Sequence, residues 1–89
     1  MKIALDYDGT YTADPWLWET FCRTAIGAGH EVVCVTMRYP TEPIEVFIPV
    51  IYTSRQAKVA FMEGRGEKVD IWIDDSPRWL LNDAGDRGL

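Results

Sequence analysis

The feature that most constrains this chain is the alternation of four short apolar segments with segments of helical pattern within 89 residues. The apolar segments cover residues 2–6, 31–36, 46–53 and 69–73. Their length and their content of β-branched residues predict buried strands. Strands that alternate with helices pair in parallel through right-handed crossovers. The sequence therefore predicts an α/β fold with a parallel sheet of about four strands, in a single domain over residues 1–89.

Capping and breaker residues give the expected bounds of the helices and of the third strand. The first helix is predicted from Asp14-Pro15 to about Gly27, the second from Ser54 to about Glu63, and a short third over residues 79–83. Proline cannot donate a hydrogen bond to a strand ladder. Pro49 therefore limits the paired part of the third strand to residues 50–53, or makes it an edge strand.

Polar side chains gather where the predicted strands end. Asp6 ends the first strand, Thr36 ends the second, and Asp74 and Asp75 follow the fourth. Lys58 lies in the first turn of the helix that follows the third strand. Because the carboxyl ends of parallel strands meet at one edge of a sheet, these side chains are expected to form one site there.

The acidic residues indicate a metal site. Asp6 and Asp8 lie two residues apart, so in an extended segment both side chains point to one side. Carboxylates this close to Asp74 and Asp75 repel one another, and a bound cation resolves the conflict. Oxygen ligands without a cysteine or histidine cluster favour Mg²⁺. A metal held by carboxylates opposite Lys58 is typical of phosphoryl transfer, in which an aspartate can attack phosphorus.

Charge and cysteine content exclude or disfavour several other classes. The net charge of −5 opposes broad, non-specific nucleic-acid binding. Cys22 and Cys34 are isolated, which favours reduced thiols in the cytoplasm over a disulfide. The sequence contains no predicted signal peptide and no apolar run long enough to span a membrane.

The run Asp6-Tyr7-Asp8-Gly9-Thr10 resembles the DxDGT signature of the haloacid dehalogenase-like (HAD) superfamily. Thr36, Lys58 and the pair Asp74-Asp75 resemble the second, third and fourth motifs of that superfamily, in the same order. The resemblance covers residues 3–76. It implies a small Rossmann-like three-layer sandwich with strand order 3-2-1-4. The short connections between the motifs further imply that the usual cap domain is missing.

The resemblance also implies roles for these residues. Asp6 would be the nucleophile that forms an aspartyl-phosphate, and Asp8 would be the general acid and base. Thr36 and Lys58 would bind the phosphoryl oxygens. Mg²⁺ would bind the Asp6 side chain, the Asp8 backbone carbonyl and one of Asp74 or Asp75, with Asp75 favoured as the direct ligand. Gly9, Thr10 and Arg38 are the further substrate-binding candidates, although Arg38 could equally be a solvated loop residue.

The sequence thus predicts a Mg²⁺-dependent phosphomonoester hydrolase. A nucleotide, a nucleic-acid end and a phosphopeptide all remain open as substrates, and a patch of Arg38, Arg55 and Lys58 could favour an anionic partner. The alternative is a module that accepts a phosphoryl group, or only binds ligands, without turnover. A homodimer is a further possibility, because a sheet this small gains stability from association.

Overall fold

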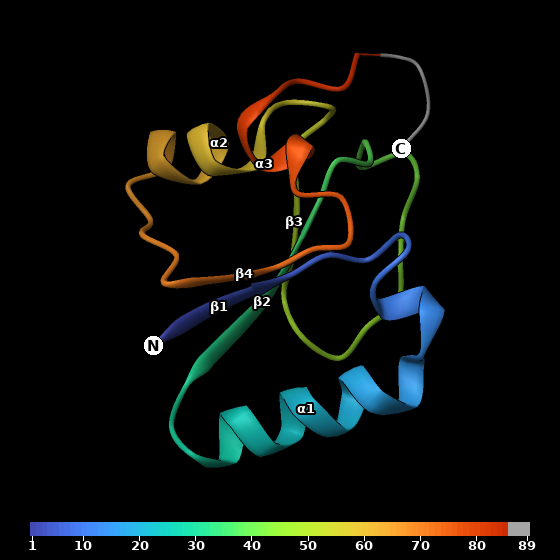
Figure 1. Ribbon diagram of the computed structural model, residues 1–89, viewed down its shortest axis with the longest axis vertical. Helices are drawn as coiled ribbons and strands as arrows, with labels where there is room; N and C mark the ends of the chain where they lie inside the picture. The colour runs from blue at the N-terminus through green and yellow to red at the C-terminus, as the bar shows by residue number, and fades with distance from the viewer. Residues whose placement is uncertain (86–89) are drawn as a thin grey trace.

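The computed structural model describes residues 1–85, which form a sheet between two layers of helix (Figure 1). The strands are β1 (Lys2–Leu5), β2 (Glu31–Thr36), β3 (Val50–Tyr52) and β4 (Ile71–Ile73). The helices are α1 (Pro15–Gly27), α2 (Lys58–Gly64) and α3 (Arg78–Leu81), with a 3-10 turn η1 (Tyr11–Ala13) before α1. Within the described residues no cap domain interrupts this order.

The sheet has four parallel strands, as the sequence pattern predicts, in the order β3-β2-β1-β4 that the motif resemblance implies. Leu5 is the register partner of both Cys34 in β2 and Ile73 in β4. The residues that follow these strands therefore come together at one edge of the sheet. The central position of β1 places Asp6 in the middle of that edge.

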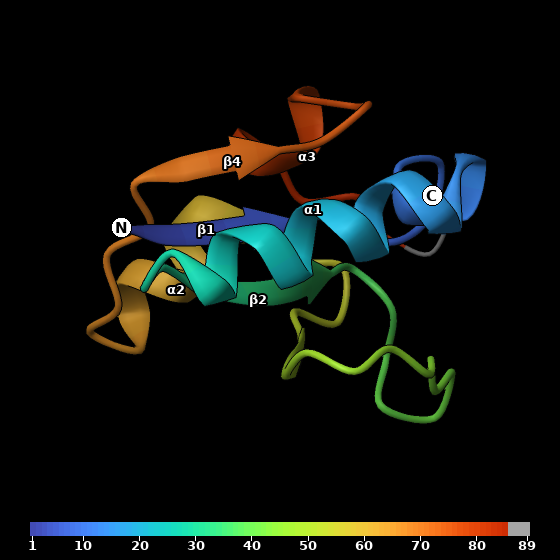
Figure 2. The same ribbon diagram turned by 90° about the horizontal axis from the view of Figure 1, so that it is seen from below.

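The alternation of side chains in β1 divides the core into two layers. Ile3 and Leu5 are buried against α1, whereas Ala4 is buried on the opposite face with Met62 of α2. Figure 2 shows α1 running across one face of the sheet while α2 lies behind it. Because both faces are covered, the strands consist almost entirely of apolar residues, as parallel strands usually do.

The third apolar segment contains both a strand and a core residue that precedes it. Only Val50–Tyr52 is a strand, and its ladder begins where Cys34 N–H donates to the carbonyl of Pro49 at 2.8 Å. Ile48, just before the proline, is buried in the core beneath α1. Both alternatives predicted from Pro49 are therefore confirmed: the register partners begin at Val50, and β3 is an edge strand.

Two local expectations are wrong. The helix predicted from Ser54 begins at Lys58, because Ser54 and Arg55 have positive φ angles of 53° and 70° that no helix accommodates. The segment after Asp6 is a turn and not an extended strand: Tyr11 N–H donates to the Asp6 carbonyl and Thr12 N–H to the Tyr7 carbonyl. Pleating therefore does not explain how Asp6 and Asp8 are oriented.

Among residues 1–85, no helix combines the length and the apolar composition that crossing a membrane requires.

Candidate active site

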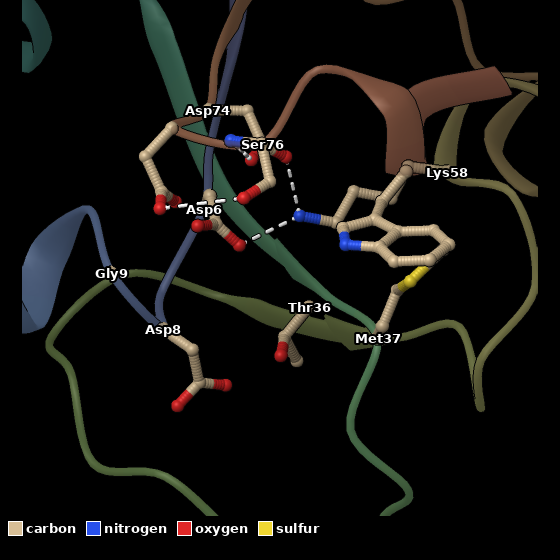
Figure 3. Close-up of a pocket in the computed structure, with 10 residues that line it drawn as sticks. Asp6, Asp8, Gly9, Thr36, Met37, Lys58, Asp74 and Ser76 are labelled. Carbon is tan, nitrogen blue, oxygen red and sulfur yellow. Dashed lines mark hydrogen bonds and ion pairs between the residues drawn. The ribbon is translucent and has the colours of Figure 1, made fainter. Parts of the chain in front are cut away.

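Asp6 lies at the floor of a pocket at the carboxyl edge of the sheet (Figure 3). Its backbone N–H extends the ladder to the carbonyl of Ile73 at 2.9 Å, so the residue is fixed at the junction of β1 and β4. It is only 8% exposed. One carboxylate oxygen, Oδ1, accepts a hydrogen bond from Lys58 Nζ at 2.7 Å, and the other, Oδ2, lies 3.0 Å from the hydroxyl of Thr10.

Lys58 is the buried cation of this pocket. It is the first residue of α2, and its side chain is 3% exposed. Its ammonium lies 2.7 Å from Asp6 Oδ1 and 2.7 Å from Asp74 Oδ2. A buried charge is tolerated only when it is paired, and here two aspartates from two different strand ends provide the pairing.

The hydroxyl of Thr10 connects Asp6, at the end of β1, with Asp75, which follows β4. Its hydroxyl lies 3.0 Å from both Asp6 Oδ2 and Asp75 Oδ1, and it accepts a hydrogen bond from the backbone N–H of Asp75 at 3.0 Å. One hydroxyl carries one proton, so it donates to one carboxylate at a time. Thr10 is 6% exposed and does not line the pocket. The structure therefore gives this predicted substrate-binding residue a positioning role.

Gly9 leaves room for the side chain of Asp75. The backbone of Gly9 has a φ of +85°, which residues with a side chain rarely adopt. A Cβ atom at this position would lie 2.8 Å from Cγ of Asp75. The glycine of the motif is thus required both for its turn and for the space that the acidic pair occupies.

Three carboxylates converge at the pocket. Asp6, Asp74 and Asp75 each offer one oxygen, and these atoms lie within 4.8 Å of one another. Burial raises the pKa of Asp6 to about 6, even though the nearby Lys58 ammonium acts to lower it. For Asp75, burial also acts to raise the pKa, but hydrogen bonds that involve Thr10, the backbone and Ser76 hold the pKa below its ordinary value. The surroundings of these two neighbouring carboxyl groups thus shift their pKa values in opposite directions.

Asp8 lines the same pocket but stands apart from the three converging carboxylates (Figure 3). Its carboxylate is held by Arg38 in a bidentate ion pair, with Nε 2.9 Å from Oδ2 and Nη2 2.8 Å from Oδ1. The Arg38 guanidinium also lies over the ring of Tyr7, 5.2 Å from its centroid. Arg38 itself does not line the pocket.

Thr36 forms part of the wall of the pocket. It is 1% exposed, and its hydroxyl oxygen accepts a hydrogen bond from the backbone N–H of Arg38 at 3.2 Å. Its proton is therefore available to a ligand oxygen. The pocket has a volume of about 140 Å³. Three further residues line it that the sequence analysis did not single out for the site: Met37, Ser76 and Trp79.

Arg55 lies outside the pocket and stabilises the loop that follows β2. Its Nη1 donates to the carbonyl of Met37 at 2.7 Å, and its Nη2 lies 3.2 Å from a carboxylate oxygen of Glu42. The expected patch of Arg38, Arg55 and Lys58 is therefore not formed as an open cationic surface, because each of these cations is paired with a carboxylate of the chain.

The charges of the pocket define its chemistry. Asp6, Asp74 and Asp75 face a single ammonium, and Asp8 is neutralised by Arg38. With its carboxylates ionised, this excess of negative charge repels a phosphate dianion but attracts a divalent cation. Oxygen donors of this kind suit Mg²⁺.

A comparison of the chain with protein-family models, with curated proteins and with solved structures found no match.

Proposed function

We propose that this protein is a Mg²⁺-dependent phosphomonoester hydrolase of the haloacid dehalogenase-like type, with Asp6 as the nucleophile. One observation carries the proposal: a buried aspartate, a buried lysine and two further aspartates, supplied by two separate strand ends and a helix start, share one small pocket. A buried ion-pair network inside the fold would account for Asp6, Lys58 and Asp74 alone. It would not account for the convergence of Asp75 as well, since like charges that approach without a counter-ion destabilise the fold.

In the first chemical step, an oxygen of the Asp6 carboxylate attacks phosphorus. The bond between phosphorus and the ester oxygen breaks, and the leaving oxygen takes a proton from the carboxylic acid form of Asp8. Lys58 and the hydroxyl of Thr36 donate hydrogen bonds to the phosphoryl oxygens as charge develops on them. Arg38 must release Asp8 from its ion pair before Asp8 can give up a proton.

In the second step, the Asp8 carboxylate takes a proton from a water molecule while the water oxygen bonds to phosphorus. The bond between phosphorus and Asp6 breaks, which releases inorganic phosphate and restores both carboxyl groups. Asp8 thus acts first as an acid and then as a base on opposite sides of one intermediate.

Magnesium held by these carboxylates would supply positive charge against the phosphoryl oxygens. The contacts support Asp75 as the direct ligand beside Asp6. Both oxygens of Asp74 are already engaged, Oδ2 by Lys58 at 2.7 Å and Oδ1 by the backbone N–H of Ser76 at 2.9 Å. Among the described residues, Oδ2 of Asp75 has one hydrogen-bond partner, the hydroxyl of Ser76 at 3.5 Å.

The test is phosphate release from a panel of phosphomonoesters, with Mg²⁺ and with a chelator. Metal-dependent release is expected in the wild-type protein and in the control Asp70→Asn, whose carboxylate accepts from Lys2 N–H at the opposite end of β1. Release should be abolished in Asp6→Asn, which keeps the shape of the side chain. Turnover that persists in Asp6→Asn would remove Asp6 as the nucleophile.

A phospho-acceptor module is the second candidate, and the Asp8–Arg38 ion pair favours it. A carboxylate held by guanidinium is poorly placed to hydrolyse an aspartyl-phosphate, which would then persist. Mass spectrometry after acid quenching distinguishes the two. A stable adduct of one phosphoryl group on Asp6, with no phosphate released, would support the acceptor module over the hydrolase.

We further propose a cytoplasmic location. Cys22 and Cys34 are both free and buried, which fits the reducing compartment that the sequence predicts.

A further inference from the structure

The pocket is too small to enclose a whole substrate. Its volume is about 140 Å³, whereas pockets that bury a drug-sized ligand have roughly 300–1,000 Å³. A phosphoryl group and the first atoms of the leaving group therefore fill it. No cap domain is inserted within residues 1–85, so the remainder of the leaving group must lie over the rim.

Burial separates the floor of the pocket from its rim. Asp6, Thr36 and Lys58 are buried, whereas Asp8 and Trp79 are partly exposed. In phosphoryl transfer the attacking and leaving oxygens lie roughly in line across phosphorus. A phosphoryl group attacked by Asp6 from the floor therefore directs its leaving group outward, toward the rim.

Trp79 is the only aromatic residue among the described residues that line the pocket. It is held close to the acidic loop, because its backbone N–H donates to the carbonyl of Ser76 at 3.1 Å. The guanidinium carbon of Arg78 lies over the indole ring, 4.9 Å from its centroid, so Arg78 covers one face of the ring and leaves the other face for a ligand. Met37 is buried and also lines the pocket, where its thioether sulfur adds a polarisable group.

We propose that Trp79 is a specificity-determining residue whose indole stacks on a planar aromatic ring carried by the leaving group, as in a nucleoside monophosphate. This inference rests on the proposed function, since it assigns the substrate class of that same site. Stacking needs only the π-face of a ring, so it selects ring-bearing phosphomonoesters over sugar phosphates without selecting one base. The acidic net charge of −5 disfavours long nucleic acid and leaves small esters as the fitting class.

The experiment compares kcat/KM for three esters: adenosine 5′-monophosphate, ribose 5-phosphate, which lacks the base, and benzyl phosphate, whose ring is close to phosphorus. Trp79→Ala should lower kcat/KM for a ring-bearing ester by about tenfold or more, through KM, and leave ribose 5-phosphate within about twofold. Trp79→Phe, which keeps an aromatic face, should retain most of the preference. Trp16→Ala, which removes an indole that is 80% exposed and does not line the pocket, is the matched control and should change none of the three.

The outcomes separate the possible sources of the ring. A loss on the nucleotide identifies a nucleotide-like leaving group, and a loss on benzyl phosphate alone identifies a ring adjacent to the ester oxygen. An equal loss on all three esters would mean that Trp79 only covers Lys58, and this would overturn the proposal. No loss on either ring-bearing ester would overturn it as well.

A binding measurement keeps this inference distinct from the proposed function. Calorimetric titration of the wild-type protein and Trp79→Ala with adenosine 5′-monophosphate and ribose 5-phosphate measures binding, so it needs no hydrolysis of either ester. Tighter binding of the nucleotide that disappears in Trp79→Ala supports stacking even if hydrolysis fails. Equal or undetectable binding of the two ligands by the wild-type protein would overturn stacking even if hydrolysis is found.

Discussion

At the scale of single residues, the site depends on the ammonium of Lys58. Its side chain is 3% exposed, and those of its partners Asp6 and Asp74 are 9% and 4% exposed. Lys58→Met would leave two buried carboxylates without a counter-ion. We expect the free energy of unfolding to fall by roughly 3–5 kcal/mol in denaturant titration without metal.

The double variant Lys58→Met/Asp74→Asn provides the control for this prediction. It removes one of the two uncompensated charges and should recover part of the lost stability. If the double variant were less stable than Lys58→Met alone, charge imbalance would not be the cause.

Asp6 gives stability a characteristic pH dependence. Burial raises its folded-state pKa to about 6 from an ordinary 3.8. Between these values the folded state binds more protons than the unfolded state, so the free energy of unfolding decreases as pH rises through this window. In the presence of a chelator, Asp6→Asn should therefore be more stable than the wild type near about pH 8, by on the order of 3 kcal/mol.

This advantage of Asp6→Asn should shrink as the pH is lowered toward about 4, because the Asp6 carboxyl group of the folded wild type is then protonated and, like asparagine, carries no charge. Melting curves across this range provide the measurement. An advantage that does not change with pH would contradict the raised pKa of Asp6, and a less stable Asp6→Asn at high pH would show that its ion pair with Lys58 outweighs its burial.

A substitution at Gly9 tests whether the position of the Asp75 side chain matters for metal binding. Gly9 and Gly29 have similar φ angles of +85° and +92°, but only at Gly9 would a Cβ meet another residue. Both Gly9→Ala and Gly29→Ala should lose about 1 kcal/mol or more of stability from backbone strain. Only Gly9→Ala should also lose the response of the melting temperature to Mg²⁺, because it displaces Asp75. An unchanged response would mean that Asp75 does not bind the ion.

At the scale of elements, the start of α2 depends on a residue far away in the chain. Ala57, at the N-cap, has no side chain to accept a hydrogen bond, and its own N–H donates to Asp83 Oδ1 at 2.7 Å. Asp83→Ala should therefore cost about 1 kcal/mol in denaturant titration, and Asp83→Asn, which keeps an acceptor oxygen, should cost less. Equal losses in the two variants would rule out this hydrogen bond as the cause.

The same element shows what sequence reasoning can and cannot reach. The alternation of apolar and helical segments predicted a parallel sheet, so the positions of Asp6 and Lys58 at its carboxyl edge could be predicted from the residues. The strand order came from the resemblance of the motifs to the haloacid dehalogenase-like superfamily. The left-handed turn at Ser54 and Arg55 could not, because it is held by hydrogen bonds to the carbonyls of Arg38 and Met37 from a distant loop. Local patterns carry no information about such partners.

The pairing of Asp8 with Arg38 was beyond the sequence for the same reason. Each residue was singled out separately as a candidate for the site, but the turn after Asp6 directs Asp8 toward the loop that follows β2. Trp79 shows the opposite case, since its position two residues beyond Ser76-Pro77 places it beside the acidic loop. An aromatic residue this close to a predicted acidic site is a signal that could have been used.

At the scale of the whole molecule, the site and the stability of the fold are coupled. Asp6 follows β1, Lys58 begins α2, and Asp74 and Asp75 follow β4, so an ion held by these carboxylates fastens together elements from both ends of the described chain. Binding to the folded state alone stabilises it by about 2.7 kcal/mol when the ion is at 100 times its Kd. For a domain of this size, each kcal/mol raises the melting temperature by roughly 4–8 °C.

Mg²⁺ should therefore raise the melting temperature of the wild-type protein by roughly 10 °C or more once the site is saturated. A monovalent salt at equal ionic strength controls for screening of the net charge of −5, and it should produce a much smaller shift. Asp75→Asn should lose most of the Mg²⁺ effect, whereas Asp70→Asn, at the opposite end of the sheet, should keep it. Equal shifts with Mg²⁺ and with monovalent salt would mean that the carboxylates bind no specific ion, and the proposed chemistry would lose its metal.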